Sequence, residues 1–241
     1  MLSFTKEPST LCRFLEQYGP NKSEFFFSFV FKQQEYLEKN KESFLHEREI
    51  ILYNSFKFTA RKKSYLIGRY AAKKALSFLF DEPVNKLYIG NGALGEPLVF
   101  GNINACISLS HSGEYAVACA CQSTSNFGID IELLKNIFDI DTASFFTYEK
   151  SHLIDDWKSK YGEGVLKAIM WSSKEALSKA LKCGLTISMK TLDISTIEGV
   201  SRDKFLVKFD AFSSYHAVVF LRKKTVISFC YPSKNLAVFS Y

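Results

Sequence analysis

The sequence predicts an α+β fold made of two halves in which strands and helices follow a similar order. Two observations carry this prediction: apolar runs of strand length alternate with long amphipathic helical stretches, and a polar run at 122–126 separates two such groups. The 241 residues are 47% hydrophobic and 23% charged, which suffices for one large or two small cores. We therefore expect an N-terminal subdomain at 1–122, a C-terminal subdomain at 123–241, and a ligand in the cleft between them.

The N-terminal half contains an amphipathic helix with a basic face. Residues 60–80 carry apolar side chains at helical spacing, and the segment 57–74 holds seven basic residues and no acidic one. Gly68 costs this helix about 1 kcal/mol relative to alanine, which indicates close approach of a backbone or ligand and singles out Arg69. The other predicted elements of this half are a strand at 25–31, helical residues at 32–56, a strand at 87–89, a glycine-rich loop at 90–95, and strands at 105–109 and 115–121.

The C-terminal half has a similar order of strands and helices, but its residues do not repeat those of the first half. Its predicted elements are a strand at 127–132, helical residues at 141–157 and 165–181, and strands at 192–197, 204–209, 216–221 and 225–231. The similarity of the halves is therefore an inference from element order alone.

Composition argues against several classes of protein. The net charge of +6 favours phosphate ligands or an acidic protein partner, and the aromatic residues lie mostly in apolar runs, which argues against nucleic acid. No apolar stretch approaches the roughly 20 residues of a membrane helix, and the first fifteen residues do not resemble a signal peptide, so we expect a cytoplasmic protein without membrane contact. Six scattered cysteines and four dispersed histidines argue against a structural zinc site.

Carboxylates in the second half predict a metal site. On a strand, Asp130 and Glu132 would project from one face, and two neighbouring carboxylates call for a hard divalent cation between them. Glu175 could add a third oxygen from a helix, and Lys179 would lie one turn further along the same helix face. Three carboxylates and a lysine favour a site that handles phosphate. The simpler alternatives are a solvated acidic strand face and an exposed Glu-Lys pair that stabilises a helix.

Two further segments contain candidate polar groups. The segment 110–113, Ser-His-Ser-Gly, is predicted to be a turn, although a hydroxyl and an imidazole beside a glycine could also hold a phosphate oxygen. It lacks the first glycine of the Gly-x-Ser-x-Gly elbow, which disfavours a serine hydrolase. The loop at 90–95 lacks the Gly-Lys-Ser/Thr ending of a Walker loop, and the chain has no Gly-x-Gly-x-x-Gly.

Five signatures together resemble those of the Sfp-type 4'-phosphopantetheinyl transferases, in the same order and at suitable separations. The resemblance runs from about residue 45 to the strand at 216–220. The signatures are Tyr65-Leu66-Ile67-Gly68-Arg69, Gly95-Glu96-Pro97, Ile107-Ser108-Leu109-Ser110-His111-Ser112-Gly113, Gly128-Ile129-Asp130-Ile131-Glu132, and Trp171-Ser172-Ser173-Lys174-Glu175-Ala176-Leu177-Ser178-Lys179.

This resemblance implies a fold and a reaction. The fold is a pseudo-twofold pair of similar α/β subdomains with the active site in the cleft between them. The reaction moves the 4'-phosphopantetheine arm of coenzyme A to a serine of an apo acyl or peptidyl carrier protein and releases adenosine 3',5'-bisphosphate, with Mg²⁺ as cofactor. Carrier proteins of this kind are acidic, which agrees with the net charge of +6, and a doubled fold implies a monomer.

The resemblance also assigns residues by position. The metal-binding positions match Asp130, Glu132 and Glu175. The coenzyme-binding positions match Arg69, Gly95, Ser110, His111 and Lys179, the last of these at the pyrophosphate. The catalytic positions match Glu175 and Lys179. The Phe-rich segment 145–149 is similar to the region that faces the carrier protein, and Glu96 stands where the family often has a basic residue, which leaves coenzyme affinity open.

The expected chemistry needs no protein nucleophile, because the attacking oxygen belongs to the carrier serine. Its proton goes to Glu175 or to a metal-bound water, with Glu149 as a further candidate base. One alternative is a Mg²⁺-dependent phosphohydrolase or nuclease that uses the same carboxylates with water in place of the serine. Another is a catalytically silent coenzyme-binding module, which the presence of all three carboxylates and the lysine does not support.

Overall fold

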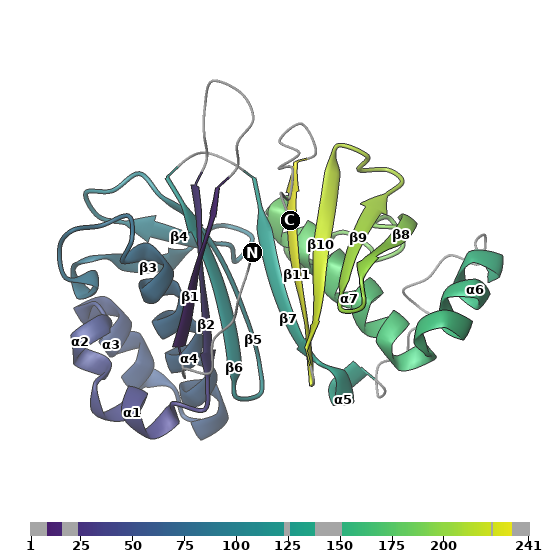
Figure 1. Ribbon diagram of the computed structural model, residues 1–241. Helices are drawn as coiled ribbons and strands as arrows, with labels where there is room; N and C mark the ends of the chain where they lie inside the picture. Colours follow the sequence, from purple (N-terminus) through teal and green to yellow (C-terminus); the bar gives the residue numbers. More distant parts are fainter. Residues whose placement is uncertain (1–8, 16–23, 123–125, 138–150, 223, 233–241) are drawn as a thin grey trace. The chain divides into compact units, whose positions relative to one another are not determined.

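The chain divides into two compact units in the computed structural model, residues 1–125 with 235–241 and residues 126–234 (Figure 1). The structure describes residues 9–15, 24–122, 126–137, 151–222 and 224–232. Within these residues, no helix is both long and apolar enough to cross a membrane. Each unit is a mixed α/β structure with its own hydrophobic core, in agreement with the predicted fold class.

The first unit is built on a four-stranded antiparallel sheet of order β1-β2-β6-β5 and a two-stranded sheet, β3-β4. Its strands are β1 (Ser9–Leu15), β2 (Glu24–Phe31), β3 (Tyr88–Asn91), β4 (Pro97–Phe100), β5 (Cys106–Ser112) and β6 (Tyr115–Cys121). Its helices are α1 (Gln34–Lys39), α2 (Lys41–Phe44), α3 (Glu47–Ser55), α4 (Thr59–Leu76) and the short 3-10 helix η1 (Val84–Lys86).

Helix α4 is the helix that packs on this sheet, against β2, β5 and β6. Its apolar face closes the core, and Ser28 in β2 donates a hydrogen bond of 2.5 Å to the carbonyl oxygen of Ala71. The expected basic face is only partly present. Lys57, just before the helix, and Arg61 are exposed, whereas Arg69 and Lys73 are buried because acidic and backbone groups of the same unit receive their charges.

Three other expectations for this unit need correction. The helical stretch 32–56 is three short helices, and a capping box of His46 and Glu49 begins the last of them. The Ser-His-Ser segment is not a turn, because β5 continues through Ser112 and the chain reverses at Gly113, whose φ of 58° favours glycine. Strands β1 and β4 were not predicted, since one is a mixed polar run and the other has four residues.

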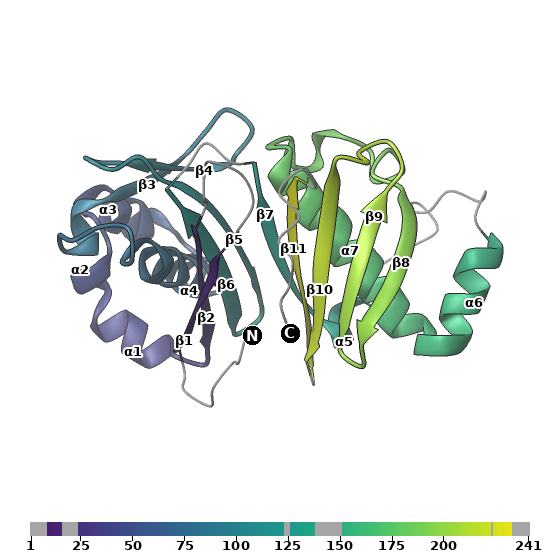
Figure 2. The ribbon, with the colours of Figure 1, turned by 45° about the horizontal axis from the view of Figure 1, so that its top comes forward.

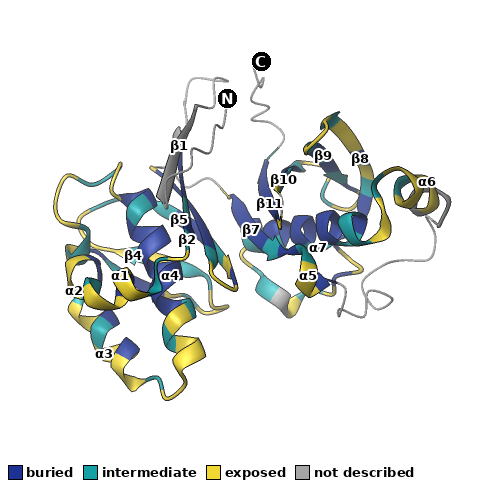
Figure 3. Ribbon diagram, turned by 60° about the horizontal axis from the view of Figure 1, so that its bottom comes forward, coloured by how far each residue is buried: buried dark blue, intermediate teal, exposed yellow. Residues whose placement is uncertain are grey.

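The second unit is a five-stranded antiparallel sheet of order β7-β11-β10-β9-β8 with helix α7 packed against β7, β10 and β11 (Figure 2). Its strands are β7 (Gly128–Leu133), β8 (Ile194–Ser201), β9 (Lys204–Phe209), β10 (Tyr215–Arg222) and β11 (Thr225–Pro232). Its helices are α5 (Leu134–Ile137), α6 (Ser151–Tyr161), α7 (Glu163–Ala180) and the 3-10 helix η4 (Gly184–Thr186). Figure 3 shows α7 buried along most of its length, as its alternation of apolar and small residues requires.

Candidate active site

Strand β7 presents two carboxylates on one face. Asp130 and Glu132 alternate with Ile129 and Ile131, which are almost completely buried, so the predicted strand pattern is confirmed. Asp130 is itself only 1% exposed and stands opposite Ser228 of β11. A carboxylate so deeply buried needs a positive partner, and the helix behind the strand supplies it.

Helix α7 provides three side chains that lie along the same strand. Trp171, Glu175 and Lys179 recur every four residues and therefore share one helix face. The Lys179 ammonium lies 2.7 Å from Oδ1 of Asp130, and Trp171 donates a hydrogen bond of 3.4 Å from Nε1 to Oε1 of Glu132. Glu175 is placed between these two contacts. Of the four residues predicted for this half, the structure pairs Asp130 with Lys179, and it pairs Glu132 with Trp171, which was not predicted as a site residue.

Gly128 permits this close contact between strand and helix. A Cβ atom added there would lie 2.6 Å from the Ala180 nitrogen and 2.9 Å from Cβ of Lys179, and still closer to the Ala176 carbonyl oxygen. These are mostly backbone atoms that cannot move aside. Glycine at this position lets β7 approach α7 closely enough for Asp130 to meet Lys179.

The electrostatic setting of Glu175 differs from that of an exposed carboxyl. Burial raises the pKa of Glu175 above its ordinary value; the Lys179 ammonium opposes this shift and the Asp130 carboxylate adds to it. Both charges therefore lie close enough to Glu175 to influence its proton affinity. A carboxylate with a raised pKa is a better proton acceptor near neutral pH than an ordinary one.

The donor chemistry of this face suits a hard cation, because all three candidate ligands are carboxylates. Among the residues that the structure describes, however, no group of three or more His, Cys, Asp and Glu side chains is placed so that it could hold a metal ion. The charge on Asp130 is met by Lys179 instead. Metal binding by Asp130, Glu132 and Glu175 therefore stays a prediction.

The candidate coenzyme residues of the first unit lie on three elements. Arg69 is in α4, Gly95 is in the turn of the β3–β4 hairpin with a φ of 85°, and Ser110 and His111 are in β5. A Cβ added at Gly68 would lie 3.5 Å from the His111 ring and 3.4 Å from Leu109, so α4 approaches this face of β5. Successive strand side chains point to opposite faces, so Ser110 lies on the other face of β5 from His111.

Sequence reasoning missed two residues that organise these elements. Lys174 is fully buried; its ammonium donates to the Met189 carbonyl oxygen at 3.0 Å and lies 3.8 Å from Asp193, so it anchors α7. Glu49 is equally buried and contacts Arg69 and Lys73. Glu49 has a local role in the capping box with His46, but the burial of Glu49 and Lys174 depends on partners far away in the sequence. The Phe-rich segment 145–149 lies outside the described residues.

Comparison with known proteins places the second unit in a family. A sequence model described as the 4'-phosphopantetheinyl transferase superfamily matches residues 126–230, which is almost the whole second unit. A holo-[acyl-carrier-protein] synthase of Petrotoga mobilis is 34% identical over 97 residues, which cover 34% of this chain and 82% of that protein. The synthase of Lactococcus lactis subsp. lactis is 38% identical over 92 residues, which cover 34% of this chain and 76% of the relative.

Among solved structures, a holo-(acyl-carrier-protein) synthase from Bacillus anthracis in complex with CoA (3',5'-ADP) has 24% identity and a TM-score of 0.37, covering 40% of this chain and 92% of that one. The sequence relatives are matched over at least three quarters of their own length, and the match falls on the unit that contains the carboxylates and Lys179. The chain therefore belongs to the 4'-phosphopantetheinyl transferase superfamily.

Proposed function

We propose that this chain transfers the 4'-phosphopantetheine arm of coenzyme A to a serine hydroxyl of an apo acyl carrier protein. The observation that carries the proposal is the packing of β7 on α7, which pairs Asp130 with Lys179 and Glu132 with Trp171, with Glu175 between these two positions of the helix. This face lies inside the segment that matches the family. The relatives are named as holo-[acyl-carrier-protein] synthases, which supports an acyl carrier protein as the acceptor.

The reaction is a displacement at the β-phosphorus of coenzyme A. A bond forms between the serine oxygen and this phosphorus, and the bond to the bridging oxygen breaks, which releases adenosine 3',5'-bisphosphate. The serine proton passes to Glu175, and the raised pKa of Glu175 supports this role. Lys179 places a positive charge beside the pyrophosphate, where negative charge develops on the leaving group.

We also assign Mg²⁺ to this reaction, held by Asp130, Glu132 and Glu175. Bound there, it would neutralise charge on the pyrophosphate and on the departing bisphosphate. Trp171 contacts Glu132 and Lys179 contacts Asp130, so two of the three carboxylates have a protein group that holds them in position. In the first unit, Arg69, Gly95, Ser110 and His111 are proposed to hold the coenzyme.

The activity is tested by intact mass spectrometry of several apo carrier proteins after incubation with the protein, coenzyme A and Mg²⁺. We expect the mass of one phosphopantetheine to be added to a carrier. Omission of the carrier provides the control. If bisphosphate appears at the same rate without any carrier, the protein is a hydrolase and the proposal fails; if no carrier gains mass and no coenzyme is consumed, the chain is a silent binding module.

The role of Glu175 is tested with Glu175→Gln, which keeps the shape of the side chain and removes its basicity. We expect turnover to fall by about 10²- to 10⁴-fold while circular dichroism and the melting temperature remain those of a folded protein. Glu198→Gln is the matched control, because Glu198 is an exposed carboxylate of the same unit that pairs with Lys208. Transfer by Glu175→Gln at the wild-type rate would refute the assignment.

We further propose that the protein acts as a cytoplasmic monomer. The basis for the monomer is the doubled order of elements in the sequence, and the composition is that of a globular protein. Cell fractionation tests the compartment, and light scattering at several protein concentrations tests the oligomeric state. A membrane-bound pool, or a mass that is a multiple of 27.5 kDa, would contradict these two expectations.

A further inference from the structure

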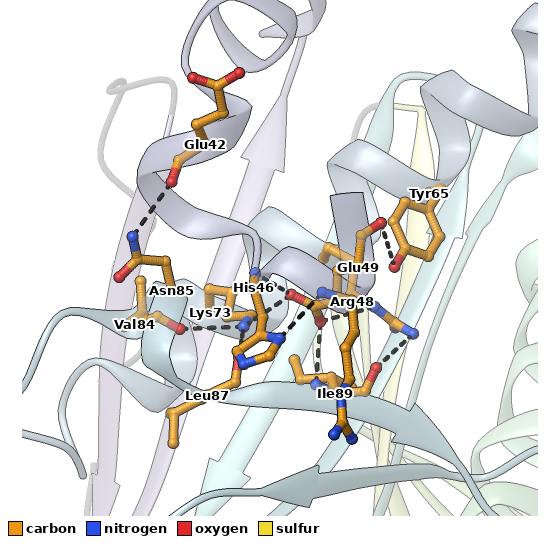
Figure 4. A network of polar contacts seen from close by, with 11 residues as sticks. Glu42, His46, Arg48, Glu49, Tyr65, Lys73, Val84, Asn85, Leu87 and Ile89 are labelled. Carbon is orange, nitrogen blue, oxygen red and sulfur yellow. Dashed lines mark hydrogen bonds and ion pairs between the residues drawn. The ribbon is translucent and has the colours of Figure 1, made fainter. Parts of the chain in front are cut away.

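A buried charge cluster surrounds Glu49 in the first unit, and the proposed function gives Glu49 and Lys73 no role. Glu49 and Lys73 are both fully buried, and Arg69 is 8% exposed. Figure 4 shows Glu49 and Lys73 among their polar partners. Charged side chains are retained in such places only when partners compensate the lost hydration. The partners of Glu49 come from three separate elements, so the cluster joins parts of the unit that are distant in the sequence.

Two backbone N–H groups and the Lys73 ammonium lie within hydrogen-bond distance of the Glu49 carboxylate, and the Arg69 guanidinium lies at ion-pair distance from it. Oε2 accepts from the His46 backbone nitrogen at 2.8 Å and lies 2.9 Å from the Lys73 ammonium. Oε1 accepts from the Ile89 backbone nitrogen at 3.1 Å and lies 3.4 Å from Nε of Arg69. One side chain therefore connects the start of α3 to helix α4 and to strand β3.

The cluster acts on β3 as a third strand would. Two-stranded hairpins are marginal by themselves, and β3 pairs only with β4 within its sheet. On the other edge of β3, Glu49 accepts from the Ile89 nitrogen, Nη2 of Arg69 donates to the Ile89 oxygen at 3.1 Å, and Lys73 donates to the Leu87 oxygen. Side chains of α3 and α4 thus satisfy the backbone edge that a neighbouring strand would otherwise occupy.

The same contacts orient Arg69. Its Nε faces Glu49 and its Nη2 binds Ile89, and the guanidinium lies 4.9 Å from the centre of the Tyr65 ring. A guanidinium carries its N–H donors in a rigid planar fork, so these contacts restrict its orientation. The side chain of Arg69 is still 10% exposed. The Glu49 carboxylate therefore contributes both to the orientation of Arg69 and to the position of the hairpin that carries Gly95.

We propose that Glu49 is a positioning residue for coenzyme A: its carboxylate holds Arg69 and the β3–β4 hairpin in the arrangement that receives the coenzyme. The inference rests on the proposed function, because it takes Arg69 and Gly95 as coenzyme-binding residues. Glu49 itself does not touch the coenzyme and acts through Arg69 and Ile89.

The test is a double-mutant cycle on coenzyme A binding. Glu49→Gln, Arg69→Met and the double variant are compared with the wild type by calorimetric Kd for coenzyme A and by KM and kcat in carrier loading. Glu49→Gln is expected to raise the Kd and KM for coenzyme A at least about tenfold while the KM for the carrier stays unchanged. In the Arg69→Met background, Glu49→Gln should raise the Kd for coenzyme A only slightly further, because a residue that acts through Arg69 loses its effect when Arg69 is removed.

Glu42→Gln is the control, because Glu42 is an exposed carboxylate of the same unit whose side chain points away from the cluster (Figure 4). If Glu49→Gln does not fold, the double variant Glu49→Gln with Lys73→Met replaces it. The second substitution removes the Lys73 ammonium, which would otherwise be buried without its carboxylate partner. An unchanged Kd for coenzyme A in the folded Glu49→Gln variant would overturn the inference. So would a double variant of Glu49 and Arg69 whose fold-change in Kd equals the product of the two single fold-changes, because the two residues would then act independently. A wild-type protein that does not load a carrier refutes the proposed function instead.

Discussion

The absence of a Cβ atom at Gly128 allows strand β7 to pack directly against helix α7. Any Cβ at Gly128 would press on backbone atoms of the helix, and the contact between Asp130 and Lys179 lies just beyond it. Gly68 offers a comparison, since a Cβ there would meet only Leu109 and His111 at ordinary contact distances. Gly68 lies inside a helix and Gly128 begins a strand, and only Gly128 is required by packing.

We predict opposite effects of alanine at these two glycines. Gly128→Ala should lower the free energy of unfolding by about 1–3 kcal/mol or more, because overpacking against a backbone cannot be relieved by side-chain rotation. Gly68→Ala should leave it unchanged or raise it by about 0.5–1 kcal/mol, because alanine is the better helix former. Urea unfolding of both variants measures the difference. A stable Gly128→Ala protein would contradict the packing argument.

At the scale of elements, the candidate site is a contact between one strand and one helix. The period of two in β7 and the period of about 3.6 in α7 each place their polar groups on one face, and packing brings these faces together. Asp130 meets Lys179 at one end and Glu132 meets Trp171 at the other. The ion pair is therefore expected to stabilise the strand–helix contact as well as to serve the reaction.

The contribution of this ion pair is tested with Lys179→Met. The Asp130 side chain is 2% exposed and that of Lys179 is 26% exposed, so loss of the ammonium should cost about 1–3 kcal/mol, less than for a fully buried pair. Asp130→Asn in the same background removes the remaining charge and should recover part of the loss. Thermal and urea unfolding provide the measurement. If the double variant is less stable than Lys179→Met, the pair does not act as described.

At the scale of the whole molecule, the family match and the charge balance concern different parts of function. The match covers residues 126–230, so the reaction chemistry is assigned to the second unit. The net charge of +6 is a property of the complete chain and bears on its encounter with an acidic partner. Charge affects the rate of encounter more than the chemical step, so the two contributions can be separated experimentally.

We expect carrier recognition to depend on salt. Raising the NaCl concentration from about 50 to 300 mM shortens the screening length and should raise the KM for an acidic carrier several-fold, with little change in kcat measured at saturating carrier and coenzyme. The melting temperature measured over the same range controls for changes in the fold. A KM for the carrier that does not vary with salt would show that net charge has no part in the encounter.

Local patterns in the sequence predicted most of the secondary structure and half of the candidate site. The alternation that predicted a strand at 127–132 and the spacing that predicted a helix at 165–181 depend only on neighbouring residues, and the structure has these elements at Gly128–Leu133 and Glu163–Ala180. Where short-range signals were weak, as in β1, in β4 and in the three helices before α4, the prediction missed the element or its bounds.

Only the tertiary structure decided which faces meet and which charges are buried. Arg69 and Lys73 have the spacing of an exposed basic helix face, yet they point into the unit because Glu49, from a preceding helix, compensates their charge. Glu49 reaches the Ile89 nitrogen across 40 residues of sequence, and Trp171 reaches Glu132 across 39. Periodicity is a local property of the chain, whereas burial and pairing depend on segments brought together by packing, so these contacts could not be predicted from residue order.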